Sequence, residues 1–546
     1  MTEDLIVTDE YTIPRALKER IQLNPDQLAL VDADSRLTFR EFGEQVDKLA
    51  SALMDLDIKP GEKVALVLPG INIYPVCMYA IIQMGGISVG INPTLRPNEF
   101  RHIFTDSEAV AVIIADTFFR VDPLAIIREM RDELTMLRQV IVVGKAGKGE
   151  LNYRDLIERT RVRDEYYQAD PDELAILVYT SGTTGLPKGS MHSHRTALRM
   201  AYRGALPLPT FKELAFTLWN YGFGYLVRLI KASRGPLKAF GATPPYTAAG
   251  AIALLLLNLW GYIFYQMDRL IPSEILKMIQ EEGIHILGCP PATGAMILNH
   301  PDIDKYDLSS LIFVLMGAAP VPPSLVDRFF EKLAVPVQIS YGASEILDLA
   351  CSTNARTDTK KQLRETVGKL NKDYEARVVD NNRNPLPVGE IGELALRGKV
   401  KMMGYYKADD LTATVFDDNG WYYTGDLATI DKKGYVRIVG RVKDLIIRAG
   451  QNIYPAELEA KMLEHPKIDQ VAVVGVPDAI AGEKVLAFII PRKDVEITML
   501  EVRDFCQGHM AAYKIPAEFY FVEDFPKNAS GKVLKRELRE EVLKTL

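Results

Sequence analysis

Strand-like apolar runs alternate with helical patterns through most of residues 1–440. "KVALVLPG" precedes "YPVCMYAIIQMGG", "VAVIIAD" precedes "DPLAIIREMRDEL", and "HILGCPP" precedes "TGAMILN". Neighbouring parallel strands need a long crossover, which is usually a helix, so this alternation is typical of a doubly wound α/β architecture. The sequence therefore predicts a large N-terminal α/β domain over residues 1–440.

The pattern changes after Asp380. Residues 377–398 and 404–441 hold short strands with Asn-Gly and Lys-Gly turns, which predict hairpins in a small β-barrel-like subdomain or distorted sheet. Over residues 441–546, a helical "YPAELEAKMLEHP" precedes strands at "VAVVGVPD" and "VLAFIIPR" and a basic tail helix. We expect a small mobile α+β C-terminal domain there.

Composition excludes several classes of protein. Hydrophobic residues make up 48% of the chain and charged residues 25%, the balance of an ordinary soluble enzyme. The formal net charge of −7 argues against nucleic-acid binding, which needs an excess of Lys and Arg. The four cysteines lie far apart, so neither a disulfide framework nor a zinc site is predicted. Because the acidic N-terminus lacks a secretory signal, we expect a cytoplasmic protein.

One apolar segment, "AAGAIALLLLNLWGYIFYQM" at 248–267, is about as long as the roughly 20 residues that span a bilayer. Asn258 and Gly261 divide it into a helical piece and a β-rich piece. We therefore favour a buried helix that leads into a buried strand over a membrane span.

The stretch "LVYTSGTTGLPKGSMHSH" at 177–194 places a Gly-, Ser- and Thr-rich loop between a buried-looking strand and a helix-like segment. Its backbone N–H groups, its hydroxyls and Lys188 would suit a polyphosphate. A Walker A loop requires Gly-Lys-Ser/Thr, but Pro187-Lys188-Gly189 stands at that spacing after Gly182, which argues against a P-loop NTPase. An ordinary surface turn is the alternative.

Six motifs in order give the chain a resemblance to the adenylate-forming superfamily, which includes acyl-CoA synthetases, peptide-synthetase adenylation domains and firefly luciferase. The motifs are "YTSGTTGLPKG", "MGAAP", "YGASE", "GWYYTGDLA", "GRVKDLIIRAGQNIYPAELE" and "PKNASGKVLKREL". The resemblance implies two steps: a carboxylate attacks the α-phosphate of MgATP, and a thiol then displaces AMP from the acyl-adenylate. It also implies ATP, Mg²⁺ and CoA as cofactors.

The resemblance assigns residues to the phosphates and the metal. The first motif would hold the β- and γ-phosphates through Ser181, Gly182, Thr183, Thr184, Gly185 and Lys188. Glu345 and Thr184 would ligate Mg²⁺, which prefers oxygen ligands. Ser344 would contact the α-phosphate at a position where the family usually has Thr.

The resemblance also assigns residues to the nucleoside. The adenine-binding walls correspond to two turns that contain Gly317, Ala318, Ala319, Pro320, Tyr341 and Gly342. Asp426 would accept hydrogen bonds from both ribose hydroxyls, and Arg441 would lie near the ribose and the phosphate.

The C-terminal motifs imply a catalytic lysine and a hinge. Lys532 matches the lysine that bridges the attacking carboxylate and the α-phosphate, where it would stabilise negative charge on both reactants. Lys443 matches the hinge about which the small domain rotates between the two steps. Gly450 matches the position beside the tunnel for the pantetheine arm of CoA.

The chain departs from the family at the acyl site. The family's "PLFHxxG" segment corresponds to "PPYTAAG" at 244–250, in which Thr247 replaces the usual His. Roles that depend on an imidazole are therefore not carried over. Tyr246, Thr247 and Gly250 are assigned only to the neighbourhood of the substrate.

Residues 199–238 are basic in an otherwise acidic chain. Seven Lys and Arg stand against Glu213, a net charge of +6, and four aromatic residues fall between positions 219 and 225. This combination is typical of an interfacial helix. Three interpretations stay open: a surface helical pair with a buried aromatic side, a lid or membrane-facing entrance for an acyl chain, and a subunit contact in a homodimer.

The sequence as a whole predicts an AMP-forming acyl-CoA synthetase that activates an apolar carboxylic acid, with a medium- or long-chain fatty acid favoured. An aromatic or alicyclic carboxylate–CoA ligase is one alternative. An acyl-adenylate ligase that loads a carrier protein is another. The predicted partners are small molecules and not nucleic acid, with peripheral membrane contact through residues 199–238 as an open question.

Overall fold

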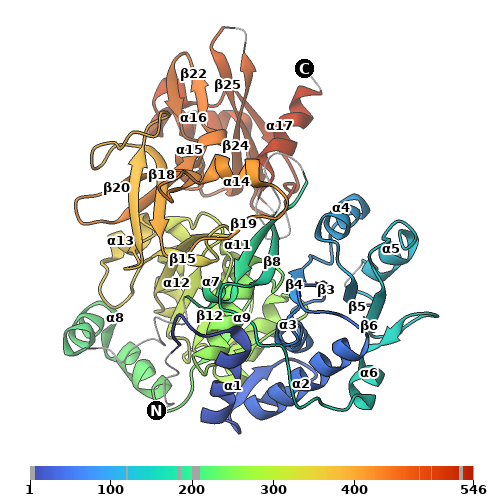
Figure 1. Cartoon of the computed structure of the whole chain (residues 1–546). Coiled ribbons are helices and arrows are strands. Elements are labelled where there is room, and N and C mark those ends of the chain that lie inside the picture. The colour runs from blue at the N-terminus through green and yellow to red at the C-terminus, as the bar shows by residue number, and fades with distance from the viewer. Residues whose placement is uncertain are drawn as a thin grey trace. The chain divides into compact units, whose positions relative to one another are not determined.

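The chain forms two compact units (Figure 1). The larger unit comprises Met1–Val321, Leu325–Thr359 and Lys399–Thr414, and the smaller one comprises Pro322–Ser324, Lys360–Gly398 and Val415–Leu546. The computed structural model describes residues 7–118, 121–180, 186–199, 210–478, 480–493, 495–527 and 533–544, with only the backbone at 211 and 256–258.

The first sheet of the larger unit has eight strands in the order β19-β9-β8-β4-β3-β5-β6-β7. Strands β3 to β8 run parallel to their neighbours, and β9 and β19 join one edge in antiparallel pairs. The bounds are β3 (Lys63–Val67), β4 (Ile87–Gly90), β5 (Ala111–Ala115), β6 (Gln139–Val143), β7 (Leu151–Asn152), β8 (Leu174–Thr180), β9 (Lys188–Ser193) and β19 (Gly404–Tyr405).

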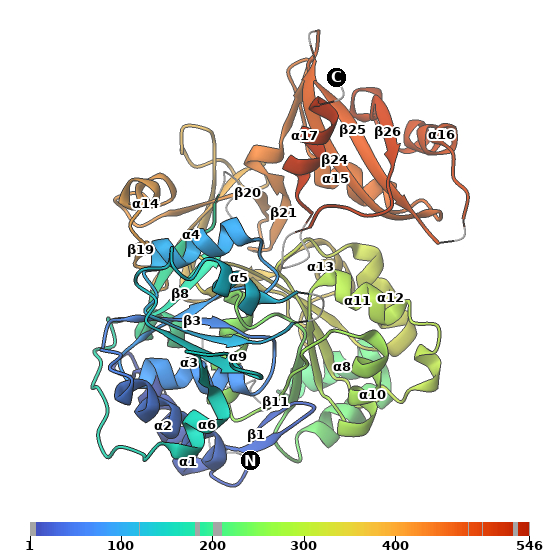
Figure 2. The ribbon, with the colours of Figure 1, turned by 90° about the vertical axis from the view of Figure 1, so that its right-hand side faces the viewer.

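Helices cover both faces of this sheet, as Figure 2 shows around β3. Val64 and Leu66 of β3 pack in one core with α2 and α3, whereas Ala65 and Val67 point the other way, into a core with α4 and α5. The bounds are α2 (Phe39–Asp55), α3 (Ile73–Gln83), α4 (Pro97–Ser107), α5 (Pro123–Glu129) and α6 (Tyr153–Arg159). The predicted doubly wound α/β architecture is confirmed.

The second sheet of the larger unit contains the run β15-β14-β13-β12-β10-β11-β1-β2. Its inner pairs are parallel, and only the pairs β14/β15 and β1/β2 within this run are antiparallel. The bounds are β1 (Leu28–Val31), β2 (Arg36–Thr38), β10 (Lys238–Gly241), β11 (Ile263–Tyr265), β12 (Ile286–Cys289), β13 (Phe313–Met316), β14 (Val337–Ala343) and β15 (Asp348–Ser352). The bounds of the helices not yet given, which lie wholly or mostly in the larger unit, are α1 (Ile13–Leu23), α7 (His194–Leu198), α8 (Phe211–Ala232), α9 (Ala248–Leu259), α10 (Pro272–Glu282), α11 (Pro291–Leu298), α12 (Pro323–Leu333) and α14 (Asp409–Val415).

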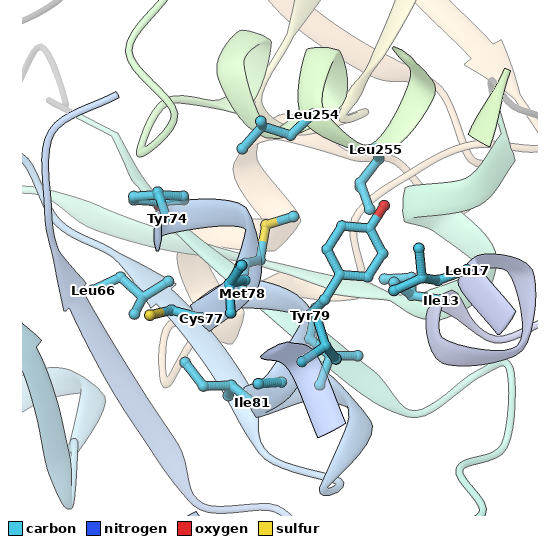
Figure 3. Close-up of a cluster of buried hydrophobic side chains, with 14 of the residues drawn as sticks. Ile13, Leu17, Leu66, Tyr74, Cys77, Met78, Tyr79, Ile81, Leu254 and Leu255 are labelled. Carbon is cyan, nitrogen blue, oxygen red and sulfur yellow. The ribbon is translucent and has the colours of Figure 1, made fainter. Parts of the chain in front are cut away.

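One apolar core joins the two sheets through α1, α3 and α9. Figure 3 shows Ile13 and Leu17 of α1 and Leu254 and Leu255 of α9 around the side chains of α3. The segment 248–267 therefore forms a buried helix followed by the buried strand β11, as predicted. Within the described residues, the structure contains no helix with the length and apolarity that crossing a bilayer requires.

The smaller unit contains a four-stranded antiparallel sheet in the order β17-β18-β20-β21. The hairpins predicted after Asp380 are present, and register shifts distort β18/β20 and β20/β21. The bounds are α13 (Lys360–Glu365), β16 (Lys369–Leu370), β17 (Tyr374–Val379), β18 (Gly392–Gly398), β20 (Tyr422–Ile430) and β21 (Val436–Arg441).

The C-terminal part of the smaller unit is a helix-covered sheet in the order β23-β22-β25-β24, with β26 parallel to β25. Val473 of β24 packs with α15 and α16, whereas its neighbours Ala472 and Val474 pack with α17. The bounds are β22 (Ile446–Arg448), β23 (Gln451–Ile453), α15 (Pro455–Met462), β24 (Ile468–Asp478), β25 (Gly482–Pro491), α16 (Met499–His509), β26 (Glu518–Phe521) and α17 (Lys535–Leu543).

Two histidines of the larger unit are buried in their neutral form. His192 of β9 is 0% exposed, and burial lowers its pKa to about 3. His194, at the start of α7, is also buried, and burial lowers its pKa to about 4. Nδ1 of His194 accepts a hydrogen bond from the backbone N–H of Ile13 at 3.2 Å, which requires a neutral ring with Nδ1 unprotonated.

Acid should destabilise the larger unit through these side chains. Their folded pKa values lie below the ordinary value of roughly 6.5, so as the pH falls below that value the unfolded chain binds protons first. Stability should be complete above about pH 6.5 and decline toward pH 4. The lowered pKa of His194 alone should reduce the free energy of unfolding by about 2 kcal/mol at pH 5, relative to neutral pH. His194→Asn keeps an acceptor near Ile13, and we expect it to reduce the loss of unfolding free energy between pH 7 and pH 5 in denaturant titrations. An equal loss in this variant and the wild type would contradict the assignment.

Candidate active site

The predicted adenine-binding residues lie at the carboxyl ends of neighbouring strands of the second sheet. Residues 317–320 follow β13, and Tyr341 and Gly342 stand at the end of β14. The two strands are parallel neighbours, with Met316 opposite Ile339, so both turns emerge at the same edge. In open α/β sheets this edge is where ligands bind.

The turn after β13 contains a strained residue. Ala318 has a φ of +65°, a left-handed conformation that residues with a side chain rarely adopt. Such residues concentrate at ligand-binding sites, where the surrounding structure holds them in place. Seven other described residues with a side chain share a positive φ, so the binding role of residues 317–320 stays a prediction.

Ser344 and Glu345 lie in the tight turn that joins β14 to β15. A bulge interrupts the pairing of the two strands at Gly342, whose residue type is fixed by packing, because a Cβ there would lie 2.1 Å from the carbonyl oxygen of Asp348. The side chains of Ser344 and Glu345, which follow this close contact in the chain, are partly exposed.

The phosphate-binding loop connects two antiparallel strands. Thr180 of β8 is paired with Lys188 of β9, and α7 begins only at His194. The prediction of a helix-like segment directly after the loop is therefore wrong, because the short strand β9 comes before α7. Ser181, Gly182, Thr183, Thr184 and Gly185 lie outside the described residues.

Tyr405 connects Lys188 with Glu345. Its hydroxyl donates a hydrogen bond to Oε1 of Glu345 at 2.6 Å, and Nζ of Lys188 lies 6.0 Å from the centroid of its ring. Burial and the neighbouring carboxylate raise the pKa of the phenol, so it stays protonated at neutral pH. The structure thus brings together two side chains assigned to phosphate and metal, and adds a tyrosine that the sequence analysis missed.

The described residues fit Mg²⁺ bound together with phosphate. They contain no group of three His, Cys, Asp or Glu side chains that could hold a metal. Mg²⁺ is commonly held by one or two carboxylates together with substrate phosphate oxygens, so Glu345 suffices on the protein side. Thr184, its predicted partner ligand, lies outside the described residues.

The segment 244–250 follows β10 at the same sheet edge, because β10 runs parallel to β12. The Thr247 hydroxyl donates to the carbonyl of Pro244 at 2.7 Å and accepts from the N–H of Gly250 at 3.1 Å. These bonds cap the start of α9. Thr247, at the position of the usual His, therefore has a structural role, and Tyr246 beside it is half-buried.

In the smaller unit, Asp426 and Arg441 face each other on β20 and β21. Nε of Arg441 donates to Oδ1 of Asp426 at 2.8 Å, and both side chains are partly buried. Each carboxylate oxygen carries two lone pairs, so a carboxylate that is already paired can accept further hydrogen bonds. The pair suits recognition of a hydroxyl-bearing group such as ribose.

Lys443 and Gly450 lie further along the smaller unit. Lys443 is in a short turn, Val442–Asp444, directly after β21. Ala449 and Gly450 join β22 to β23 with φ values of +50° and +77°, the geometry of a two-residue hairpin turn. Gly450 therefore also has a local reason to be glycine. Lys532 lies outside the described residues.

Comparison with known families supports one assignment. The model of the AMP-binding enzyme family matches residues 17–406, and that of the AMP-binding enzyme C-terminal domain matches residues 457–532. The first match contains the motifs at 179–189, 316–320 and 341–345, and the second contains residues 526–532 of the last motif. The motif at 420–428 lies between the two matches.

Relatives match along their full lengths. A CoA ligase of Rhodococcus jostii, named for a propanoyl group on a methyl-dioxo-octahydroindene ring, is 32% identical, covering 97% of this chain and 98% of its own. The long-chain-fatty-acid–CoA ligase of Escherichia coli is 30% identical, covering 94% and 92%. A crystal structure of an anthranilate CoA ligase with anthranoyl-AMP superposes with a TM-score of 0.86 at 26% identity, covering 99% of both chains. The chain therefore belongs to the AMP-binding enzyme family of the adenylate-forming superfamily.

Proposed function

We propose that the chain activates an apolar carboxylic acid, with medium- and long-chain fatty acids as the preferred class. At a coarser level it is an AMP-forming acyl-CoA ligase that uses ATP, Mg²⁺ and CoA. The observation that carries the chemistry is the convergence of Lys188 and Glu345 on Tyr405 within a chain of this family. The fatty-acid preference draws support from the Escherichia coli relative.

The proposed first step uses residues at the edges of the two sheets of the larger unit. Lys188 would hold the phosphates that leave as pyrophosphate, where negative charge builds as the bond breaks. The Ser344 hydroxyl would donate to the α-phosphate. Glu345 would hold Mg²⁺, which when bound offsets the charge of the phosphates.

Residues of the smaller unit would serve the nucleoside and the attacking group. Asp426 would accept from the ribose hydroxyls, with Arg441 to orient it. Lys532 would stabilise the attacking carboxylate and the α-phosphate in the first step. We propose that residues 441–546 rotate about Lys443 before the second step and that Gly450 then lies beside the pantetheine arm.

An alicyclic acid is the second candidate substrate. The Rhodococcus jostii relative is named for a propanoyl group on a bicyclic ring, and its identity to this chain is similar to that of the fatty-acid ligase. Both acids place a carboxylate on an aliphatic chain, and the bicyclic one adds a ring with two ketone oxygens, so the proposed chemistry is the same and only the acyl pocket differs.

Helix α8 supports a further proposal about location, namely that it docks on an anionic membrane surface. Gly222, with a φ of +80°, divides α8 into two helical pieces at a kink. Its inner side is anchored: the Tyr225 hydroxyl donates to the carbonyl of Ile312, and Tyr221 contacts the ring of Phe330 at 5.8 Å. Its outer side presents Trp219 and Phe223, which are 89% and 72% exposed. The aromatic residues of the segment are thus divided between the core and the surface.

Charge favours an anionic surface as the partner of this face. Lys212 lies exposed at one end of α8, and Lys231 and Arg234 lie exposed at the other. Exposed aromatic side chains between basic residues are typical of segments that lie in a membrane interface, where each cation contributes about 1 kcal/mol near anionic lipid. Residues 200–209, which complete the basic segment, lie outside the described residues.

A panel of acids tests the substrate class. Release of AMP in the presence of CoA should be measured with fatty acids of increasing length, benzoate, cyclohexanecarboxylate and a bicyclic propanoate. Each methylene buried in an apolar site contributes about 0.8 kcal/mol, so kcat/KM should rise roughly fourfold per methylene until the site is filled. A higher kcat/KM for the cyclic acids would reject the fatty-acid preference. Pyrophosphate exchange without formation of a CoA thioester would instead indicate loading of a carrier protein.

Substitution of the C-terminal lysine separates the half-reactions. Lys532→Ala should reduce acid-dependent pyrophosphate exchange roughly 100- to 1,000-fold, because it removes a charge needed in that transition state. It should still convert supplied acyl-adenylate to the thioester. Lys527→Ala is the matched control, since Lys527 lies on the same tail but pairs with Asp524 at 2.7 Å. Equal loss of both half-reactions in Lys532→Ala would contradict the assignment.

Vesicle binding tests the surface of α8. The wild type should co-sediment with phosphatidylglycerol vesicles, and Trp219→Ser with Phe223→Ser should abolish binding. Ile480→Ser is the control, because Ile480 is 98% exposed in the smaller unit and carries no such role. Absence of wild-type binding would refute the proposal. A dimer that the double variant disrupts would identify the face as a subunit contact instead.

A further inference from the structure

Tyr405 lies between Glu345 and Lys188. The proposed function assigns Glu345 to Mg²⁺ and Lys188 to pyrophosphate. Tyr405 is 6% exposed, so packing restricts its ring. Its hydroxyl donates to Oε1 of Glu345 at 2.6 Å, a charge-assisted hydrogen bond to a single carboxylate oxygen. The other oxygen of Glu345 is left with its lone pairs for a further ligand.

Backbone hydrogen bonds fix both partners of this contact. Tyr405 pairs with Ser190 across β19 and β9, and the N–H of the next residue, Tyr406, donates to the carbonyl of Gly189 at 2.8 Å. On the same segment, the N–H of Met402 donates to the carbonyl of Glu345 at 2.7 Å. The short segment 402–406 therefore holds the turn that contains Glu345 against the strand that begins with Lys188.

We propose that Tyr405 is a positioning residue that orients the Glu345 carboxylate for Mg²⁺, an inference that rests on the proposed function. A carboxylate that binds a cation through one oxygen can rotate about its terminal bond. A hydrogen bond to the other oxygen limits this rotation, as partners of metal ligands commonly do. Tyr405 would act through Glu345 and not as a metal ligand itself.

A purely structural hydrogen bond would behave differently. Its loss would lower the stability of the larger unit but would leave the Mg²⁺ concentration needed for nucleotide binding unchanged. The dependence of binding on Mg²⁺ is therefore the deciding measurement, and overall activity is not.

Tyr406 is a matched control for Tyr405. Its hydroxyl donates to Oε2 of Glu108 at 3.3 Å, and Nζ of Lys63 lies 5.2 Å from the centroid of its ring. The two adjacent tyrosines thus each contact a carboxylate and lie near a lysine. Neither Glu108 nor Lys63 belongs to the proposed site, so the same loss of a hydroxyl can be compared inside and outside it.

The experiment titrates Mg²⁺ against Tyr405→Phe and Tyr406→Phe in the full chain at fixed ATP. The readouts are the rise in thermal unfolding midpoint on nucleotide binding and the rate of acid-dependent pyrophosphate exchange. Tyr405→Phe should need roughly 10- to 100-fold more Mg²⁺ for half-maximal effect, while its ATP binding in EDTA matches the wild type. Tyr406→Phe should match the wild type throughout. An unchanged Mg²⁺ midpoint in Tyr405→Phe would overturn the proposal.

Glu345→Gln separates failure of this inference from failure of the proposed function. If Glu345→Gln raises the Mg²⁺ midpoint and Tyr405→Phe does not, only the role of Tyr405 is wrong. If Glu345→Gln leaves the Mg²⁺ midpoint unchanged, the metal assignment of the proposed function is wrong, and the role of Tyr405 is rejected with it.

Discussion

The antiparallel pairing of β19 with β9 holds the candidate site of the larger unit together. Lys188 comes from the first sheet and Glu345 from the second, so neither sheet can place both side chains by itself. The segment 402–406 contacts both, through backbone bonds to Gly189 and Glu345 and through the hydroxyl of Tyr405. A segment that follows β18 in the chain thus links the carboxyl edges of two earlier sheets, which the core around α1, α3 and α9 also joins.

The fold was largely predictable because its signals are local. Parallel strands buried on both faces appear as continuous apolar runs, and each is followed by a helix with its own periodicity. The segment 248–267 was assigned correctly because Asn258 and Gly261 interrupt it, which a bilayer-spanning helix would not favour. The six motifs located the candidate residues in sequence, and the parallel order of β13 and β14 explains why two of those motifs meet at one edge.

The features that the sequence did not reveal depend on distant partners. Tyr405 belongs to an unremarkable "GYYK", and its importance follows from a carboxylate 60 positions earlier. The strand β9 has no strand-like alternation, and only its pairing with β8 distinguishes it from the helix that was expected. Thr247 could not be identified as a helix cap because its partner, the carbonyl of Pro244, belongs to a turn whose shape the residue types do not determine.

The apolarity of α9 gives no support for an apolar substrate. The helix packs against α1 and α3 between the two sheets, so core packing alone accounts for its composition. The segment 244–250 in front of it is equally constrained: a side chain at Gly90, at the end of β4, would come within 3.1 Å of Cα of Tyr246. In the proposed acyl site, specificity for the acid would therefore come from side chains that can change without disturbing this contact. The capping hydroxyl of Thr247 is not one of them, and the half-buried ring of Tyr246 packs against the same core as α9, so a change of its size would also reach that core.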